Sequence, residues 1–356
     1  MRILLTGANG FLGKKVAMDL LDEGHELYLL VRNKNKLKTF FEELPGSEQR
    51  SRVHVLEGDV TSTNLGLLAE EIQGITSSID AIYHMAALLS FDPNDRDFSY
   101  KVNVDGTKHV LDFAVTINCK KFFYVSTAYT IGMESEGFEE LYSTDREFVN
   151  YYEETKCIAE HLVLSYSDQL FVSILRPAII IGDSKTGQAD TSFGLYGFLK
   201  SLYLLKRKMA RNQDSRDRKF HVRINLDVNS NLVPVDYVSM VFVSALSYAK
   251  NKEIFNITNP NPPIHSDLIR VIKEVLDFPN LETISFDSDY QLREDEMLFN
   301  KPLDVFKSYW SHSRRFPCEN TKRVLELSGK TPLDMDEKML RTIIHGFVDK
   351  KVPVLK

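Results

Sequence analysis

Tyr152 and Lys156 are the two residues whose types and spacing most directly predict chemistry in this chain of 356 residues. Four residues apart on a helix, their side chains lie on the same face. A phenol has an ordinary pKa of about 10 and exchanges protons poorly near neutrality, but a neighbouring ammonium group favours the phenolate. Lowering that pKa by about three units corresponds to roughly 4 kcal/mol. The pair therefore predicts proton transfer, with an ordinary pair on a helix surface as the alternative.

A hydroxyl group at the end of the preceding apolar segment would complete such a site. Residues 122–126 predict a strand that ends at Ser126, and Thr127 follows directly. Either hydroxyl could hydrogen-bond the oxygen on which the tyrosine acts, and either could instead cap the end of the strand.

The first thirteen residues predict a nucleotide-binding turn. An apolar run, 3–5, stops at Thr6, three glycines follow at three-residue spacing, and residues 14–21 carry a helical apolar pattern. A strand, a glycine turn and a helix present backbone N–H groups and a helix N-terminus to a pyrophosphate. The residues of this turn that we expect to contact the cofactor are Gly7, Asn9, Gly10, Phe11, Leu12 and Gly13.

The residues that follow the second apolar run, 27–31, indicate which dinucleotide is bound. An NAD-binding unit places Asp or Glu here to hold the ribose 2′-hydroxyl, whereas this chain has Arg32, followed by Lys34 and Lys36. A guanidinium group forms charge-assisted, often bidentate hydrogen bonds with phosphate. Arg32 and Lys36 therefore predict NADP(H) as the cofactor, a solvated basic turn being the alternative.

The elements that must position these residues alternate between strand and helix patterns. The candidate strands are 3–5, 27–31, 53–57, 81–84, 122–126 and 172–175, and the candidate helices between them are 11–23, 64–73, 97–117 and 153–167. Strands joined by connections of helix length predict an α/β fold with a doubly wound parallel (Rossmann) sheet. Ligands of such sheets bind beyond the carboxyl ends of the strands.

The second half of the chain changes in pattern after Arg176 and Pro177. A turn-rich segment, 182–187, precedes an apolar run, 193–205, and a basic run, 206–219. Residues 232–235 predict a return to the sheet, a helix is expected to begin near Asp236, and 255–257 predict a last strand. We therefore expect a Rossmann domain of 1–177 plus 226–258, and a smaller, mostly helical substrate-binding domain of 178–225 plus 259–356.

Composition excludes several function classes. The net charge of −6 argues against nucleic-acid binding. Cys119, Cys157 and Cys318 have no metal-ligand spacing and indicate a reducing compartment, so we expect neither a metal nor disulfides. No apolar run is long enough to cross a membrane, and because the first residues form a strand we expect no signal peptide. We therefore expect a soluble, cytoplasmic protein.

Over most of its length the chain resembles the extended short-chain dehydrogenases/reductases. The matching motifs are TGANGFLG at 6–13, Gly58-Asp59-Val60, His84-Met85-Ala86-Ala87, Asn103 in VNVDGTKHVLDFA, Thr127 five residues before Gly132, the Tyr152/Lys156 pair, Arg176-Pro177 and VPVDYV at 233–238. The resemblance implies that Tyr152 exchanges a proton with the substrate oxygen, that Thr127 bonds this oxygen, and that Lys156 holds the nicotinamide ribose and lowers the tyrosine pKa. It also implies that Asp59 and Val60 flank the adenine, that Ala86 and Ala87 lie near its ribose, and that Pro177 and Ile180 contact the nicotinamide side.

Within that superfamily, RPAIIIGDSKTG, LLVR, VSTAY and the C-terminal FPCENTKR are most similar to the thioester-reductase and fatty acyl-CoA reductase branch. The resemblance implies NADPH-dependent reduction of an acyl thioester, or of a derived aldehyde. Met1 already begins the first strand, so we expect no adenylation or carrier module, and the acyl group would arrive on a separate carrier, on CoA or as a free aldehyde.

Two other functions, an acyl channel and the role of the basic residues remain open at this point. The chain could be a nucleotide-sugar epimerase or dehydratase, although Arg32 stands where those enzymes usually carry an acidic residue, or a sensor that binds NADPH without turnover. We expect residues 182–211 and the C-terminal helices to enclose an acyl channel beside Thr127 and Tyr152. Lys206, Arg207, Lys208 and Arg211 could meet CoA or carrier phosphates or a membrane surface, or form a solvated basic loop.

Overall fold

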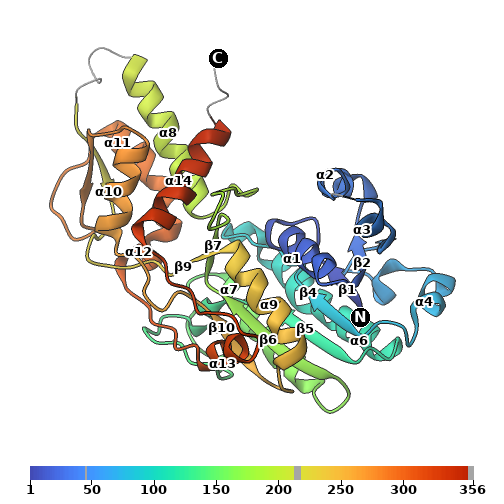
Figure 1. The fold of residues 1–356 in the computed structure, drawn as a ribbon. Coiled ribbons are helices and arrows are strands. Elements are labelled where there is room, and N and C mark those ends of the chain that lie inside the picture. The colour runs from blue at the N-terminus through green and yellow to red at the C-terminus, as the bar shows by residue number, and fades with distance from the viewer. Residues whose placement is uncertain (45, 212–217, 352–356) are drawn as a thin grey trace. The chain divides into compact units, whose positions relative to one another are not determined.

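A parallel sheet of seven strands organises the first of two compact units in the computed structural model, which describes residues 1–44, 46–211 and 218–351 (Figure 1). The strand order is β10-β6-β5-β4-β1-β2-β3. The strands are β1 (Arg2–Thr6), β2 (Glu26–Val31), β3 (Val53–Glu57), β4 (Ala81–His84), β5 (Lys121–Val125), β6 (Phe171–Pro177) and β10 (Ile254–Ile257). Both faces of the sheet are covered, which is why its central strands are nearly continuous apolar runs.

Helices cover the sheet on both sides, as a doubly wound fold requires. The helices of this unit are α1 (Phe11–Asp22), α2 (Lys38–Glu43), α3 (Ser47–Ser51), α4 (Ala69–Ile75), α5 (Arg96–Tyr100), α6 (Gly106–Thr116), α7 (Tyr151–Ser165), α9 (Val235–Tyr248) and α13 (Glu319–Leu327). One buried cluster joins α4, α6 and α7 to the sheet. On the other face α9 packs against β4, where Phe242 stacks on Tyr83, and Ser239 of α9 bonds Asp19 of α1 at 2.6 Å.

The predicted doubly wound parallel sheet is confirmed, and the helix expected over 97–117 is interrupted. A π-helical turn, Lys101–Asp105, separates α5 from α6 and carries Asn103, which is 1% exposed. Short 3-10 turns are η1 (Lys34–Leu37), η2 (Thr63–Gly66), η3 (Pro93–Asp95) and η5 (Ala128–Ile131). The helix expected over 64–73 is likewise divided between η2 and α4, because Asn64, Leu65 and Gly66 have positive φ.

The second unit has a core and two small sheets of its own. Its strands are β7 (Ile179–Ile181), β8 (Phe220–Arg223), β9 (Leu232–Pro234) and β11 (Leu281–Ile284), paired as β7 with β9 and β8 with β11. Its helices are α8 (Leu195–Arg211), α10 (His265–Val275), α11 (Glu294–Asn300), α12 (Lys307–Ser311) and α14 (Glu337–Lys351), with the 3-10 segment η6 (Lys301–Phe306). The prediction that 232–235 returns to the main sheet is therefore wrong, because β9 takes β7 as its partner.

The chain passes between the two units more often than the sequence predicted, so that each unit consists of three segments. The first comprises 1–178, 237–258 and 316–332, and the second 179–236, 259–315 and 333–356. Segment 316–332 joins the first unit because α13 is tied to the edge strand β10: Thr321 Oγ1 donates to the Asn256 carbonyl at 2.9 Å. Glu139 bridges the same two elements, accepting from the backbone N–H of Asn256 at 2.9 Å and of Asn320 at 2.7 Å.

Candidate functional site

The glycine turn between β1 and α1 is built for close backbone approach. Gly7 has φ +76°, and a Cβ there would lie 2.8 Å from the backbone nitrogen of Ala86. A Cβ on Gly13 would lie 2.2 Å from the Gly7 carbonyl oxygen. Gly10 precedes α1 without a side-chain cap, so the first N–H groups of the helix face outward with no acceptor from the helix itself. This turn fits a pyrophosphate, as the sequence predicted.

A directed chain of hydrogen bonds holds the turn to the end of β4. The backbone N–H groups of Met85 and Ala86 donate to Thr6 Oγ1 at 3.2 and 3.1 Å. Thr6 Oγ1 lies 2.8 Å from His84 Nδ1, and His84 Nε2 lies 3.0 Å from Thr107 Oγ1. Since Thr107 donates its own hydroxyl to the Asn103 carbonyl at 2.7 Å, it accepts from His84 Nε2–H, which leaves Nδ1 to accept from Thr6.

His84 is therefore a neutral structural residue rather than a proton donor. It is 1% exposed, and burial, aided by the charge of Lys156, lowers its pKa to about 3. Its role is to fix the loop that begins at Met85, where Ala86 is half-buried and Ala87 exposed.

The cations predicted to read a 2′-phosphate lie at the surface beyond β2. Arg32 and Lys36 are both exposed, and Asn33 caps η1 by accepting from the backbone N–H of Asn35 at 2.9 Å. Beyond β3, Asp59 Oδ1 accepts from the backbone and hydroxyl of Thr61, both at 2.9 Å, and Val60 is 9% exposed. Arg32, Lys36, Asp59 and Val60 therefore follow the carboxyl ends of neighbouring strands, where ligands of such sheets bind.

Helix α7 carries the tyrosine and lysine, and a cap fixes where it begins. The Asn150 side chain accepts from the Glu153 N–H at 3.0 Å, and the Glu153 carboxylate accepts from the Val149 N–H at 3.3 Å. Glu153 is 1% exposed, so this cap is buried.

Tyr152 and Lys156 both have strongly shifted acidity. Burial, with a smaller contribution from Glu153, raises the pKa of the Tyr152 phenol above its ordinary range. Burial lowers the pKa of Lys156 to about 7, with Glu160 acting in the opposite direction. The sequence-based expectation that Lys156 lowers the tyrosine pKa is thus not met here, because burial dominates. A phenol that stays protonated at neutral pH suits a proton donor.

The lysine ammonium group is anchored beside the end of β5. Lys156 is 2% exposed, its Nζ donates to the Val125 carbonyl at 2.5 Å, and it lies 4.3 Å from the Tyr124 ring centroid. Ser126 Oγ is buried without a hydrogen-bond partner in the described part of the chain. An unpaired buried hydroxyl at the end of β5 marks a place where a polar ligand would supply a partner.

Thr127 and Ser126 differ in what their hydroxyls already do. Thr127 is 7% exposed and Ser126 is 2% exposed. Thr127 Oγ1 accepts from the Tyr129 N–H at 3.3 Å and so caps η5, which leaves its hydroxyl hydrogen able to donate elsewhere. The capping interpretation of Thr127 is thus met, and Thr127 can still donate to a substrate oxygen.

Asn103 ties the site together through contacts that its position in the sequence motif does not reveal. Its side chain accepts from the Leu88 N–H at 2.8 Å and donates to the Leu88 carbonyl at 3.1 Å and to Thr155 Oγ1 at 3.0 Å. Thr155 in turn donates to the Tyr152 carbonyl at 3.0 Å. One amide thereby joins the loop after β4 to the first turn of α7.

Arg176 and Pro177 end β6, and the arginine braces α7. Arg176 Nε and Nη2 donate to the two Glu160 carboxylate oxygens at 2.7 and 2.6 Å. The arginine is 1% exposed and the glutamate 0%. Pro177 is buried in this unit, whereas Ile180 belongs to β7 of the second unit.

The basic residues within 206–211 belong to a helix, and at least one of them is bound within its own unit. Lys206, Arg207, Lys208 and Arg211 continue α8 rather than forming a loop, and 212–217 lie outside the described residues. Lys206 Nζ donates to the Leu276 carbonyl at 2.8 Å and pairs with Asp277 at 3.0 Å. Lys206 is therefore already engaged within its own unit.

Two absences concern only the part of the chain that the structure describes. No helix there is long and apolar enough to cross a membrane. No cluster of His, Cys, Asp and Glu in residues 1–44, 46–211 and 218–351 is arranged to hold a metal ion.

Comparisons with known proteins agree with this geometry. A model of an NAD-binding family described as "Male sterility protein" matches residues 5–242. Fatty acyl-CoA reductase wat of Drosophila melanogaster is 26% identical over 310 residues, covering 74% of this chain and 56% of that protein. A linear gramicidin synthase protein of Brevibacillus parabrevis is 29% identical over 293 residues, covering 76% of this chain and 5% of that protein.

A solved structure extends the likeness to both units. The terminal R domain from the myxalamid PKS-NRPS biosynthetic pathway superposes with a TM-score of 0.81 at 25% identity, covering 98% of this chain and 91% of that one. The chain spans 56% of the reductase and 5% of the synthase protein named above.

Proposed function

The chain belongs to the male sterility protein family of NAD(P)-binding domains, a branch of the extended short-chain dehydrogenases/reductases that includes thioester-reductase and fatty acyl-CoA reductase domains, and on that premise we propose that it is an NADPH-dependent reductase of acyl thioesters. The observation that carries the proposal is the likeness to a terminal R domain over 98% of the chain. The placement of Tyr152 and Lys156 four residues apart on α7 supports it.

The residues present fit a dinucleotide. The glycine turn leaves no room for a Cβ at Gly7 or Gly13, and the first amides of α1 are free for a pyrophosphate. Arg32 and Lys36 are the cations that would hold a 2′-phosphate, which is why we propose NADPH. When bound, the cofactor supplies the hydride that the thioester carbonyl carbon accepts.

The chain's own residues hold the carbonyl oxygen and supply its proton. Tyr152, kept protonated by burial, donates its phenolic proton to the substrate oxygen, and the Thr127 hydroxyl donates a hydrogen bond that orients the same oxygen. Lys156, whose pKa of about 7 leaves it partly charged at neutrality, stabilises the phenolate that remains. The hemithioacetal formed in this way releases the thiol when its C–S bond breaks and its hydroxyl proton passes to the departing sulfur, so that one thioester, one hydride and one proton give one aldehyde and one thiol.

The acyl group would arrive on a phosphopantetheine-bearing carrier protein or on CoA. The test is NADPH oxidation by the full chain with acyl-CoA, acyl-carrier protein, free aldehyde and a UDP-sugar in parallel. Each methylene buried contributes roughly 0.8 kcal/mol, or about a two- to fourfold gain in kcat/KM. We expect thioester-dependent oxidation that rises with acyl length; activity on the UDP-sugar with a flat response to length would contradict the proposal.

A further inference from the structure

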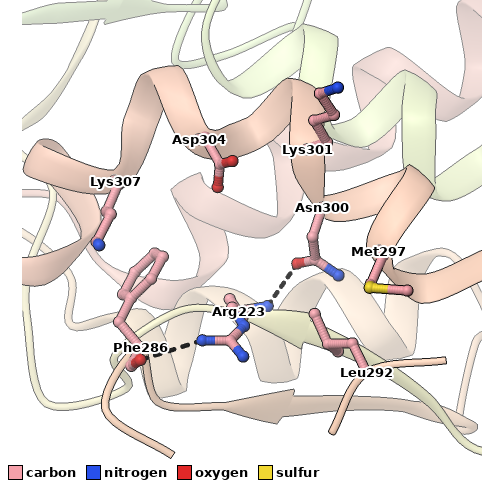
Figure 2. A pocket seen from close by; sticks show the side chains of 8 residues that line it. All are labelled: Arg223, Phe286, Leu292, Met297, Asn300, Lys301, Asp304 and Lys307. Atoms are coloured by element: carbon pink, nitrogen blue, oxygen red, sulfur yellow. Dashed lines mark hydrogen bonds between the residues drawn. The ribbon is translucent and has the colours of Figure 1, made fainter. Parts of the chain in front are cut away.

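A cavity of about 340 Å³ in the second unit combines unpaired charges with an apolar wall (Figure 2). Arg223 at the end of β8 and Phe286 form its floor, and α11, η6 and the start of α12 form its opposite side. Its lining residues are Arg223, Phe286, Leu292, Met297, Asn300, Lys301, Asp304 and Lys307. All of them belong to the second unit.

The guanidinium group of Arg223 is held in place and still has N–H donors without an acceptor. Its backbone N–H donates to Asn300 Oδ1 at 2.8 Å, and its Nη1 donates to the Phe286 carbonyl at 3.1 Å. Asn300 is 5% exposed and is fixed in turn by donating to the carbonyls of His221 and Glu296 at 3.0 and 2.8 Å. Nη2 and Nε of Arg223 are thus positioned without an acceptor among the described residues.

Two further charges face this guanidinium group. Figure 2 shows the side chains of Asp304 and Lys307 pointing into the cavity, whereas Lys301 points away from it. Within residues 1–44, 46–211 and 218–351, none of Arg223, Asp304 and Lys307 forms an ion pair; Lys307 Nζ lies 5.7 Å from the Phe286 ring centroid. Asp304 and Lys307 are exposed and Arg223 is half-buried, so these charges line an open hollow; a concave site with a partly apolar wall and a few convergent polar groups is typical of a ligand pocket.

We propose that this cavity binds a phosphomonoester attached to an apolar or aromatic body, and its assignment to the substrate's phosphorylated carrier group rests on the proposed function. Arg223 and Lys307 complement a dianion by charge-assisted hydrogen bonds. Asp304, an exposed carboxylate, favours a ligand that carries a hydroxyl or amide donor and repels a bare anion. Phe286, Leu292 and Met297 cover the apolar body. The 3′-phosphoadenosine end of CoA meets all of these requirements, whereas the phosphopantetheine arm on a carrier protein, a phosphodiester with one negative charge, meets only the requirement for hydroxyl and amide donors.

The chain's single tryptophan lies close enough to report binding. Trp310 is in α12 with Lys307, and its ring stacks on Phe306 with centroids 5.4 Å apart. Titration with 4′-phosphopantetheine, adenosine 3′,5′-bisphosphate and inorganic phosphate, without NADPH, should be followed by calorimetry and by Trp310 fluorescence. We expect saturable binding of one organic phosphate at least tenfold tighter than that of inorganic phosphate, and the tighter of the two identifies the source.

Lys307 and Lys301 give a matched pair of variants. Lys307→Met should weaken binding of the organic phosphate by about tenfold or more, as expected for a charged hydrogen bond, whereas Lys301→Met should change it less than twofold. Asp304→Asn should weaken the organic phosphate and strengthen inorganic phosphate. Arg223→Lys keeps the positive charge and loses the bidentate hydrogen bonding of the guanidinium group. It provides a second variant if Lys307→Met does not fold.

The proposal is overturned if neither organic phosphate binds, or if the two lysine variants weaken binding equally. Free aldehyde reduction carries no phosphate, so it should be the same in the Lys307→Met and Lys301→Met variants. Absence of phosphate binding with aldehyde reduction intact therefore refutes this site alone, and absence of any reductase activity refutes the proposed function alone.

Discussion

Replacing Glu160 by Gln tests whether the buried ion pair behind α7 stabilises the catalytic helix. The two Glu160 oxygens accept from Arg176 at 2.7 and 2.6 Å, and Arg176 also donates to the carbonyls of Phe138 and Glu140 at 3.1 and 2.9 Å. Gln keeps the shape and one acceptor but removes the only carboxylate that pairs with this guanidinium group in the described residues. A buried positive charge would then lack a counter-ion.

The expected magnitude follows from the burial of both partners. Arg176 is 1% exposed and Glu160 0%, and breaking a pair of this kind costs about 3–5 kcal/mol. For a unit of this size each kcal/mol lowers Tm by about 2–4 °C, so the fall in Tm should be roughly 6–20 °C. Glu160 also raises the pKa of Lys156, so the pKa of Lys156 should be lower in the Glu160→Gln variant.

Thermal and urea unfolding, monitored by circular dichroism, measure the first effect, and Glu253→Gln is the matched control. Glu253 forms a similar two-oxygen pair with Arg323 at 2.8 and 2.7 Å, but their side chains are 14% and 29% exposed. Partly exposed pairs contribute about 0–1 kcal/mol. An equal loss of stability in the two variants would refute the reasoning, because burial would then not set the cost.

Three other outcomes follow from the site. Tyr152→Phe should lower turnover about 10²–10⁴-fold while NADPH binding, measured by its fluorescence, changes less than twofold; unaltered single-turnover hydride transfer would argue against the proton-donor role. Arg32→Asp should lower the kcat/KM preference for NADPH over NADH by roughly 10- to 150-fold, and an unchanged ratio would mean that another residue reads the phosphate. In the folded state the pKa of His84 is about 3, whereas in the unfolded state it is near 6.5. The free energy of unfolding should therefore fall by up to about 1.4 kcal/mol per pH unit as the pH is lowered from 6.5 to 3. His84→Gln should remove that part of the slope in urea unfolding at pH 7 and pH 5, and an unchanged slope would contradict it.

Local patterns were enough to predict the parallel sheet. The strands 53–57 and 81–84 have the predicted bounds. The second is buried along its whole length, and a strand buried on both faces requires an apolar run. The glycine turn was likewise predictable, since the steric demands on Gly7 and Gly13 arise within a short stretch of chain and the adjoining loop.

Contacts between residues far apart in the chain could not be predicted from the sequence. His84, Thr6 and Thr107 are far apart in sequence, and only strand order brings them together. Residues 232–234 pair with β7, which lies about fifty residues earlier in the chain, and not with the main sheet. Lys206 appeared available for a phosphate because its partners, Leu276 and Asp277, lie 70 and 71 residues further along the chain. Sequence spacing cannot reveal such neighbours.

The most direct test of the central claim is the fate of the hydride. The full chain is incubated with an acyl thioester and NADPH deuterated at both C4 positions, and the aldehyde is trapped and analysed by mass spectrometry. Thioester reduction predicts one deuterium on the aldehyde carbon, with one thiol released for each NADPH oxidised, and loss of this product in Tyr152→Phe. Aldehyde without deuterium, or thiol release without NADPH oxidation, would contradict it.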